Sequence, residues 1–109
     1  MLNQSQIDCL QACNDCAAAC RQCASACLKS DDLKSLAKCI SLDIECADIC
    51  SLTASLIAQS GDQVKAACAV CAAACDACES ECAKHKMDHC RKCAEACKRC
   101  AEACRSMAN

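Results

Sequence analysis

The sequence predicts an all-α protein, an antiparallel four-helix bundle with a cysteine-lined core. Its composition favours helices, because alanine is abundant, proline is absent and only one glycine occurs. Strands are disfavoured, because β-branched residues are scarce and the chain has no Phe, Tyr or Trp. The cysteines, 19 of 109 residues, recur mostly at alternating steps of three and four, which keeps their side chains on one helical face. A chain of this length is expected to form one domain, residues 1–109.

Three breaks separate the four expected helices. In "QSGDQ", Gly61 is expected to end one helix and Asp62 to cap the next. In "LKSDDLK" the expected cap is Ser30 or Asp31, and in "KHKMDHC" it is Asp88. The expected helices span roughly residues 4–28, 32–59, 62–84 and 88–107. Because the loops between them are short, neighbouring helices are expected to be antiparallel.

Three of these helices carry a continuous cysteine face. The first contains Cys9, Cys13, Cys16, Cys20, Cys23 and Cys27. The third contains Cys68, Cys71, Cys75, Cys78 and Cys82, and the fourth contains Cys90, Cys93, Cys97, Cys100 and Cys104. Each face corresponds to the seam by which a helix packs in a bundle, with cysteine in the place of leucine.

The second helix departs from this pattern. Its seam holds only three cysteines, in phase with one acidic and two other residues: Cys39, Cys46, Cys50, Asp43, Thr53 and Ile57. Leucine and isoleucine flank the seam on both sides, so the apolar arc is wider than one core face requires. This width favours self-association through the second helix; the alternative is that the helix only closes the bundle.

Charge and hydropathy exclude several partners. The formal net charge is −2 and the isoelectric point is about 5.6, which argues against nucleic acid and anionic membranes as partners. The apolar runs are shorter than a membrane span, and "MLNQSQIDCL" has neither the basic start nor the apolar core of a secretory signal. We therefore expect a cytoplasmic protein whose thiols are kept reduced.

The thiols could serve packing, disulfide formation, iron–sulfur ligation or the binding of other metal ions. Packing alone would not require so many cysteines when alanine and leucine are available. Disulfides demand a specific geometry that neighbours on one helix do not offer, and an odd number of cysteines cannot pair completely within one chain. Iron–sulfur proteins usually have compact cysteine runs, whereas these cysteines extend along whole helices. Binding of many metal ions is the remaining interpretation.

Spacing and charge favour Cu(I) as the metal. Residues i and i+4 have Cβ atoms roughly 5–6 Å apart, and two sulfurs on one ion lie about 4.5 Å apart. A C-x-x-x-C pair can therefore hold a two-coordinate soft ion, which suits Cu(I). Eight such pairs exist: 9/13, 16/20, 23/27, 46/50, 71/75, 78/82, 93/97 and 100/104. One Cu(I) per thiolate leaves the core neutral, as do protonated thiols, so the bundle is expected to be folded before loading.

Three segments make the family resemblance specific. With C-x-x-x-C repeats on four helices, "LDIECADIC", "KHKMDHC" and "CAEACRSMAN" resemble the bacterial cytosolic copper storage proteins over nearly the whole chain. The resemblance implies a homotetramer of four-helix bundles without a signal peptide, each storing many Cu(I) ions in its core. It also implies that all 19 cysteines are copper ligands, and it matches His85, Met87 and His89 to the family's entrance residues by type and location.

The expected entrance is at one end of the bundle. His85, Met87 and His89 lie where the third helix turns into the fourth, whereas the other end is expected to be closed by Leu56, Ile57 and Val64. The alternative is that His85 and His89 are ordinary solvated loop residues. Asp43 is either a metal ligand or, as we favour, a carboxylate hydrogen-bonded within the bundle.

The sequence thus predicts cytosolic storage of many Cu(I) ions by cysteine thiolates. The alternatives are a metallothionein-like zinc or cadmium buffer, which would need thiols from facing helices to complete tetrahedral sites, and a disulfide-stapled structural protein. No nucleophile–base pair or glycine-rich loop is evident, so no enzyme activity is expected.

Overall fold

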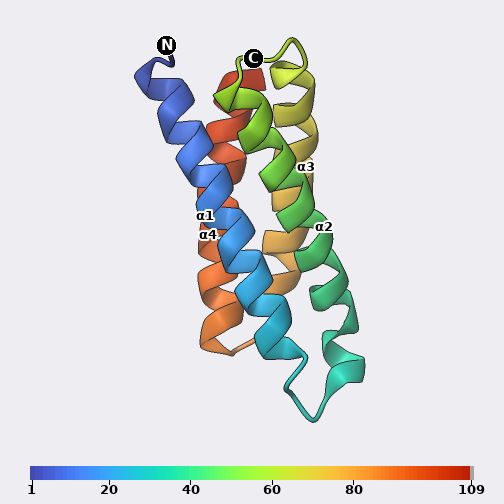
Figure 1. Cartoon of the computed structure of the whole chain (residues 1–109). Helices are drawn as coiled ribbons and strands as arrows, with labels where there is room; N and C mark the ends of the chain where they lie inside the picture. Colours follow the sequence, from blue (N-terminus) through green and yellow to red (C-terminus); the bar gives the residue numbers. More distant parts are fainter. Residues whose placement is uncertain (109) are drawn as a thin grey trace.

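The computed structural model describes residues 1–108 as four helices joined by short loops (Figure 1). They are α1 (Gln4–Cys27), α2 (Leu33–Ala58), α3 (Val64–Cys82) and α4 (Asp88–Ala108). The helices form an elongated bundle of 47 × 18 × 17 Å. The expected all-α, antiparallel four-helix architecture is confirmed.

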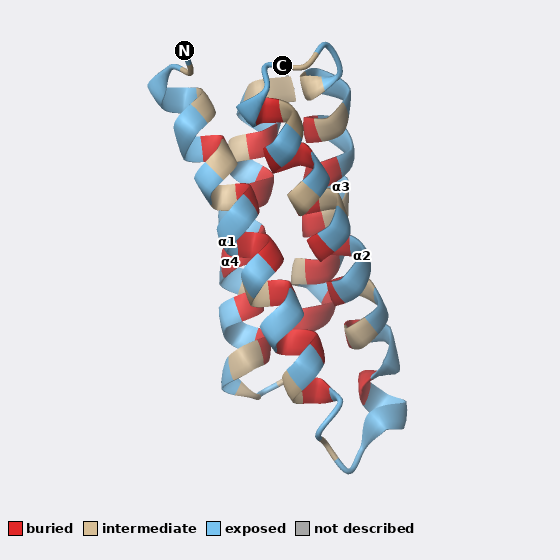
Figure 2. Ribbon diagram, viewed as in Figure 1, coloured by how far each residue is buried: buried red, intermediate tan, exposed pale blue. Residues whose placement is uncertain are grey.

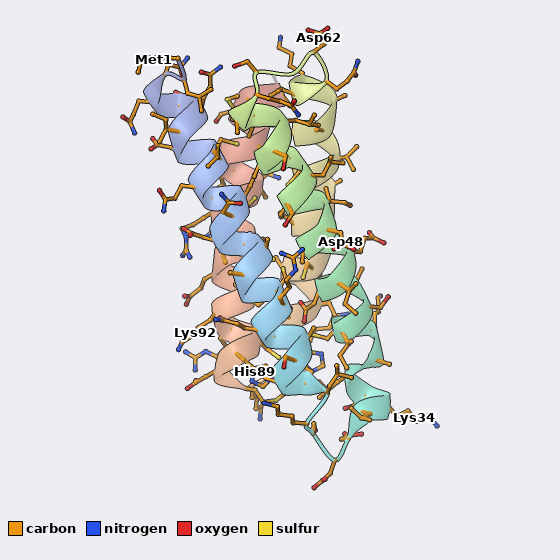
Figure 3. The ribbon with its side chains drawn as sticks, viewed as in Figure 1. Met1, Lys34, Asp48, Asp62, His89 and Lys92 are labelled. Atoms are coloured by element: carbon orange, nitrogen blue, oxygen red, sulfur yellow. The ribbon has the colours of Figure 1, made fainter. Side chains whose placement is uncertain are left out.

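Each helix packs on two neighbours, in the cyclic order α1, α2, α3, α4. The start of the chain, the end of α4 and the loop after α2 lie at one end, which we call the terminal end (Figure 1). The loops after α1 and α3 lie at the other end, which we call the histidine end because it carries His89 (Figure 3). No helix within residues 1–108 is long and apolar enough to cross a membrane.

Helix α1 begins with a reciprocal capping box. The side-chain oxygen of Asn3 accepts a hydrogen bond of 2.9 Å from the backbone N–H of Gln6. The side chain of Gln6 accepts one of 2.8 Å from the backbone N–H of Asn3. Two backbone donors that would otherwise lack a helical partner are thus satisfied, which fixes where the first helix starts.

The expected caps of the later helices are wrong by one or two residues. Helix α2 is preceded by Asp32 rather than Ser30 or Asp31, because Ser30 accepts a hydrogen bond from the Asp32 backbone and so belongs to the loop. Helix α3 is preceded by Gln63 rather than Asp62, because residues 62 and 63 form a turn. Asp88 is the first residue of α4 rather than its cap, where its charge favours the positive end of the helix dipole.

Helix α2 ends in a Schellman motif whose left-handed residue is Ser60, not the neighbouring glycine. Ser60 has φ 54, whereas Gly61 does not have a positive φ. The backbone N–H of Gly61 donates to the Leu56 carbonyl at 2.9 Å, and that of Ser60 donates to the Ile57 carbonyl at 3.0 Å. The expected stop at Gly61 is therefore one residue late, and a non-glycine residue holds the conformation that glycine prefers.

The buried residues of the four helices face the bundle axis (Figure 2). Most of these buried residues are cysteines. Every cysteine is at most 1% exposed, and small alanines such as Ala47 and Ala101 let the helices approach closely. The largest fully buried side chains other than cysteine are Ile57, Thr53 and Asp43, and all three belong to α2. Cysteines thus form a continuous buried face on α1, α3 and α4, whereas Asp43, Thr53 and Ile57 interrupt the corresponding face of α2.

Candidate metal centre

The candidate centre is the set of 19 buried cysteines that line the bundle axis, which we call the thiol column. All 19 are free thiols. They come from all four helices, and the seam positions identified in the sequence are the positions that the fold buries. The predicted cysteine-lined core is confirmed.

Within each helix, the expected C-x-x-x-C pairs bring sulfurs close together. The Sγ atoms of Cys46 and Cys50 are 3.8 Å apart, and those of Cys16 and Cys20 are 3.9 Å apart. Such distances are shorter than the ~4.5 Å between two sulfurs on one two-coordinate ion. Small side-chain rotations would let a soft ion enter between them.

Contacts between helices are at least as short, and the sequence did not reveal them. The Sγ of Cys50 lies 3.6 Å from that of Cys71 on α3, and the Sγ of Cys93 lies 3.6 Å from that of Cys20 on α1. The helices therefore pack with their sulfurs in register. Only the relative axial positions of the helices determine these pairs, and spacing along one helix contains no such information.

The close contacts form a nearly continuous path through the bundle. Successive sulfurs lie 3.6–3.9 Å apart along the series Cys82, Cys78, Cys20, Cys97, Cys16, Cys75, Cys50, Cys71, Cys100, Cys13, Cys104 and Cys9. At the histidine end, Cys39 joins the series through a contact of 3.6 Å to Cys82. Each thiolate can thus bridge ions that its neighbours also bind.

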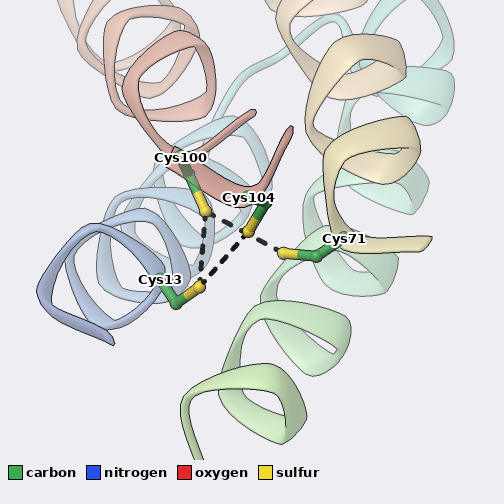
Figure 4. Close-up of side chains that lie close together, drawn as sticks. All are labelled: Cys13, Cys71, Cys100 and Cys104. Carbon is green, nitrogen blue, oxygen red and sulfur yellow. Dashed lines mark hydrogen bonds between the residues drawn. The ribbon is translucent and has the colours of Figure 1, made fainter. Parts of the chain in front are cut away.

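Groups of four sulfurs recur along the column. In one of them, Cys13, Cys71, Cys100 and Cys104 from three helices converge, with all four sulfurs within 4.8 Å of one another (Figure 4). A second group, Cys23, Cys27, Cys39 and Cys90, includes the last residue of α1 and a residue in the first turn of α4, and therefore lies at the histidine end. Cys16 and Cys20 each belong to more than one group. The arrangement therefore suits clusters with shared thiolates rather than isolated sites.

Burial raises the pKa of three thiols near the ends of the column, Cys68, Cys90 and Cys39. It raises the pKa of Cys68 to about 12 and that of Cys90 to about 11, since the charged form loses its hydration. The pKa of Cys39 is raised for the same reason, with the negative charge of Asp43 adding to the effect. A soft cation must therefore displace protons when it binds these sulfurs.

Asp43 lies fully buried among the thiols. Its Oδ1 atom accepts hydrogen bonds from Cys78 at 3.2 Å, Cys93 at 3.3 Å and Cys82 at 3.5 Å. Burial raises its pKa to about 7, mainly because the charged carboxylate is desolvated. The favoured interpretation of Asp43 as a carboxylate hydrogen-bonded within the bundle agrees with this geometry. Its role as a metal ligand stays a prediction.

The two histidines at the histidine end have different partners. Nε2 of His89 lies 3.4 Å from Sγ of Cys27, so this imidazole touches the thiol column directly. Nε2 of His85 lies 2.9 Å from a carboxylate oxygen of Glu81. Met87 is half-buried and packs against the core. These contacts argue against the alternative that both histidines are ordinary solvated loop residues.

Sequence reasoning missed Glu81. Its side chain is nearly buried, and the hydrogen bond from His85 holds its pKa below the usual range. Lys84 adds a contact of 3.5 Å to the other carboxylate oxygen. The available signal was the four-residue step from Glu81 to His85, which places both side chains on one face of a helical turn.

The terminal end lacks this polar set. Ile57 and Thr53 are fully buried there, and the Thr53 hydroxyl donates to the Ile49 carbonyl at 2.8 Å. Leu56, in the last turn of α2, and Val64, the first residue of α3, are half-buried. A threonine and an isoleucine, Thr53 and Ile57, therefore occupy the positions where cysteines would continue the α2 seam.

Fold and site together define a class of protein: a helical bundle whose interior is a column of thiols suited to many soft metal ions. The chain belongs to the copper storage protein family, whose model matches residues 2–109. It is also 49% identical over 66 residues to the uncharacterized cysteine-rich protein YhjQ of Bacillus subtilis. That match covers 61% of this chain and 55% of YhjQ, so the chain spans little more than half of that relative.

Solved structures show the same fold. The Cu(I)-bound copper storage protein BsCsp3 is similar with a TM-score of 0.93 at 47% identity, over 97% of this chain and all of that one. A cytosolic copper storage protein from Streptomyces lividans, loaded with five coppers, has a TM-score of 0.93 at 39% identity, over 96% and 92% of the two chains. The metal-free form of copper storage protein 3 from Bacillus subtilis has a TM-score of 0.86 at 48% identity, covering 94% and 97%.

Proposed function

We propose that this protein stores many Cu(I) ions in its thiol column. The observation that carries the proposal is the path of sulfurs 3.6–3.9 Å apart that runs from Cys82 to Cys9. Thiolates select soft Cu(I), and bridging sulfurs let neighbouring ions share ligands. Family membership and the Cu(I)-bound relative support the same conclusion.

Charge favours Cu(I) over zinc as the stored ion. One Cu(I) for each thiolate gives a neutral core, as do protonated thiols without metal. Zn²⁺ in a four-thiolate site would leave two negative charges in a buried environment, which is costly without compensation. The groups of four sulfurs could still hold zinc geometrically, so metal content must decide between the two ions.

The decisive experiment is an anaerobic titration of the reduced protein with Cu(I) in competition with a chromophoric Cu(I) chelator. We expect a loading that approaches one ion for each of the 19 thiols. Zinc binding is measured in parallel with a zinc-responsive chelator as the control. Saturation near four Cu(I) ions, or preferential retention of zinc, would favour the metallothionein-like alternative.

The ligands we propose are all 19 cysteines, with His85, Met87 and His89 at the entrance. Asp43 is a further candidate ligand inside the column, although we favour its role as a carboxylate that accepts hydrogen bonds from the thiols. The 3.4 Å contact between His89 and Cys27 supports entry at the histidine end. Imidazole and thioether groups bind soft ions less tightly than thiolates do, so they can pass ions inward. The buried aliphatic side chains support closure of the terminal end.

We also propose that a second copy of the chain covers α2, within a homotetramer. Leu33, Ile44 and Leu52 of α2 are large apolar residues that lie about half exposed. Apolar grooves flank the helix on both sides, one with α1 beside Ile44 and one with α3 beside Leu52. Light scattering coupled to gel filtration tests the assembly, with Ile44→Lys and Leu52→Lys expected to yield smaller species. A monomeric wild-type protein would contradict it.

We place this storage in the cytoplasm as a single copper-binding domain, residues 1–109, without enzymatic activity. The relative from Streptomyces lividans is a cytosolic protein, which supports the location. The buried, closely spaced thiols support a store rather than a catalyst, because they leave little room for a substrate beyond the ions themselves. Fractionation of cells that express the protein tests the location.

A further inference from the structure

Glu81 is the nearly buried carboxylate that neither the thiol column nor the sequence pattern explains. It lies in the last turn of α3 at the histidine end and is only 8% exposed. Burying a carboxylate is costly unless it is paired, and Glu81 has two partners. Its closer partner is Nε2 of His85 at 2.9 Å; the other is the exposed Lys84 at 3.5 Å.

We propose that Glu81 is a positioning residue for copper entry, which holds Nε2 of His85 and thereby leaves Nδ1 free to take the incoming Cu(I). The proposal rests on the storage function and on entry at the histidine end. It adds to them a residue outside the ligand set, and it assigns different tasks to the two histidines.

The chemistry of imidazole supports this assignment. A neutral imidazole has one N–H donor and one nitrogen with a free lone pair, and an ionised carboxylate can only accept. The 2.9 Å contact therefore places the proton of neutral His85 on Nε2 and the lone pair on Nδ1. A carboxylate on the second nitrogen also fixes the orientation of a metal-binding ring and makes the ring a better ligand.

His89 shows the contrast. Its Nε2 atom faces Cys27 at 3.4 Å, so it is placed to exchange an ion with the first thiols of the column. His85 is held instead by Glu81, and its side chain remains 16% exposed, so it meets solvent as well as protein. In this arrangement His85 receives the ion and His89 transfers it to Cys27.

The first test needs no copper. In the metal-free protein at alkaline pH, where imidazole is neutral, ¹⁵N NMR distinguishes the two tautomers of His85. We expect the Nε2–H tautomer in the wild type and a mixture of tautomers in Glu81→Ala. A wild-type His85 with its proton on Nδ1 would overturn the proposal, whether or not any variant folds.

The second test measures the rate of Cu(I) transfer from a chelator by stopped flow. Glu81→Ala should slow loading about tenfold or more, which is the size of effect that such carboxylates have on metal sites. Glu81→Gln should recover part of the rate, because its amide oxygen can accept the same hydrogen bond. The control is Glu95→Ala, which removes an exposed carboxylate from α4 and should load like the wild type.

A double variant separates positioning from general damage. In the His85→Ala background, Glu81→Ala should have no further effect on the rate, because Glu81 acts through His85. A persistent effect in that background, an unchanged rate in Glu81→Ala alone, or faster loading would overturn the proposal. Failure of the storage function would appear differently, as low Cu(I) capacity of the wild type itself.

Discussion

Nε2 of His89 lies 3.4 Å from Sγ of Cys27, although 62 residues separate the two in the chain. The contact joins the start of α4 to the end of α1 and links the surface of the histidine end to the thiol column. It is the most direct connection between a weaker ligand at the surface and the buried sulfurs, and it leads to the first prediction.

Replacing His85, Met87 and His89 together with alanine should slow both Cu(I) loading and removal, whereas capacity should remain nearly unchanged. The reason is that the thiols remain, while the groups that we propose pass ions between solvent and Cys27 are lost. Stopped-flow transfer from a Cu(I) chelator measures the rates, and a full titration measures the capacity. Lys86→Ala, an exposed position in the same loop, is the control. Unchanged rates in the triple variant would move the entrance elsewhere.

The reduced, metal-free protein should already be mostly helical. Its seam can be filled by neutral thiols, which pack as small apolar groups, and the capping box of α1 needs no metal. Far-UV circular dichroism before and after Cu(I) loading should therefore show similar spectra. A coil spectrum that becomes helical only when Cu(I) is added would contradict the preformed bundle.

Asp43 should make the stability of the metal-free protein depend on pH. The pKa of its buried carboxyl is raised from 3.8 to about 7, so the folded state keeps a proton that the unfolded chain has lost. Between these values the unfolded state binds fewer protons, and the free energy of unfolding therefore falls as pH rises from 3.8 to about 7. At 1.36 kcal/mol per pKa unit, the loss amounts to at most about 4 kcal/mol.

Asp43→Asn removes this titration while keeping a similar shape and a side-chain carbonyl acceptor. The variant should lose less stability than the wild type over the same pH interval. Urea unfolding under anaerobic, reducing conditions at a series of pH values measures the difference. Parallel pH profiles for the two proteins would show that Asp43 titrates as an ordinary carboxyl.

Ser60→Gly should stabilise the protein. Ser60 has φ 54, a left-handed conformation that costs a non-glycine residue about 1 kcal/mol or more, and its side chain is exposed. Glycine removes this cost without disturbing the two hydrogen bonds that end α2. Thermal unfolding of the metal-free protein should show a higher Tm, whereas Ser55→Gly inside α2 should lower it. An unchanged or lower Tm for Ser60→Gly would contradict the argument.

Regular features of the fold could be predicted from the sequence, because they depend on spacing within single segments. The steps of three and four residues identified the buried cysteine faces, and the helix bounds agree with the structure within about two residues, the usual uncertainty of such boundaries. The apolar flanks of α2 were evident for the same reason, since a helix has a fixed period.

The remaining features depend on how segments meet. The 3.6 Å contact between Cys50 and Cys71 requires the axial register of α2 and α3, which no spacing within one helix determines. Whether Ser60 or Gly61 adopts the left-handed conformation depends on the exact residue at which α2 ends. The sequence pattern does not locate a helix end to within one residue. Glu81 was missed because a charged residue on a helix normally faces solvent, and here the loop before α4 brings His85 back over it.

The proposed closure of the terminal end by Ile57, Leu56 and Val64 would determine the order in which stored ions leave the protein. If ions enter and leave only at the histidine end, they pass the same few sulfurs in both directions. The ions that bind last are then the ones nearest the exit. Copper acquired early would lie deepest, near Cys9 and Cys104, and would be returned last. Under repeated cycles of plenty and shortage, the cell would draw on a rapidly exchanged fraction near Cys27, while an older reserve at the far end stayed in place.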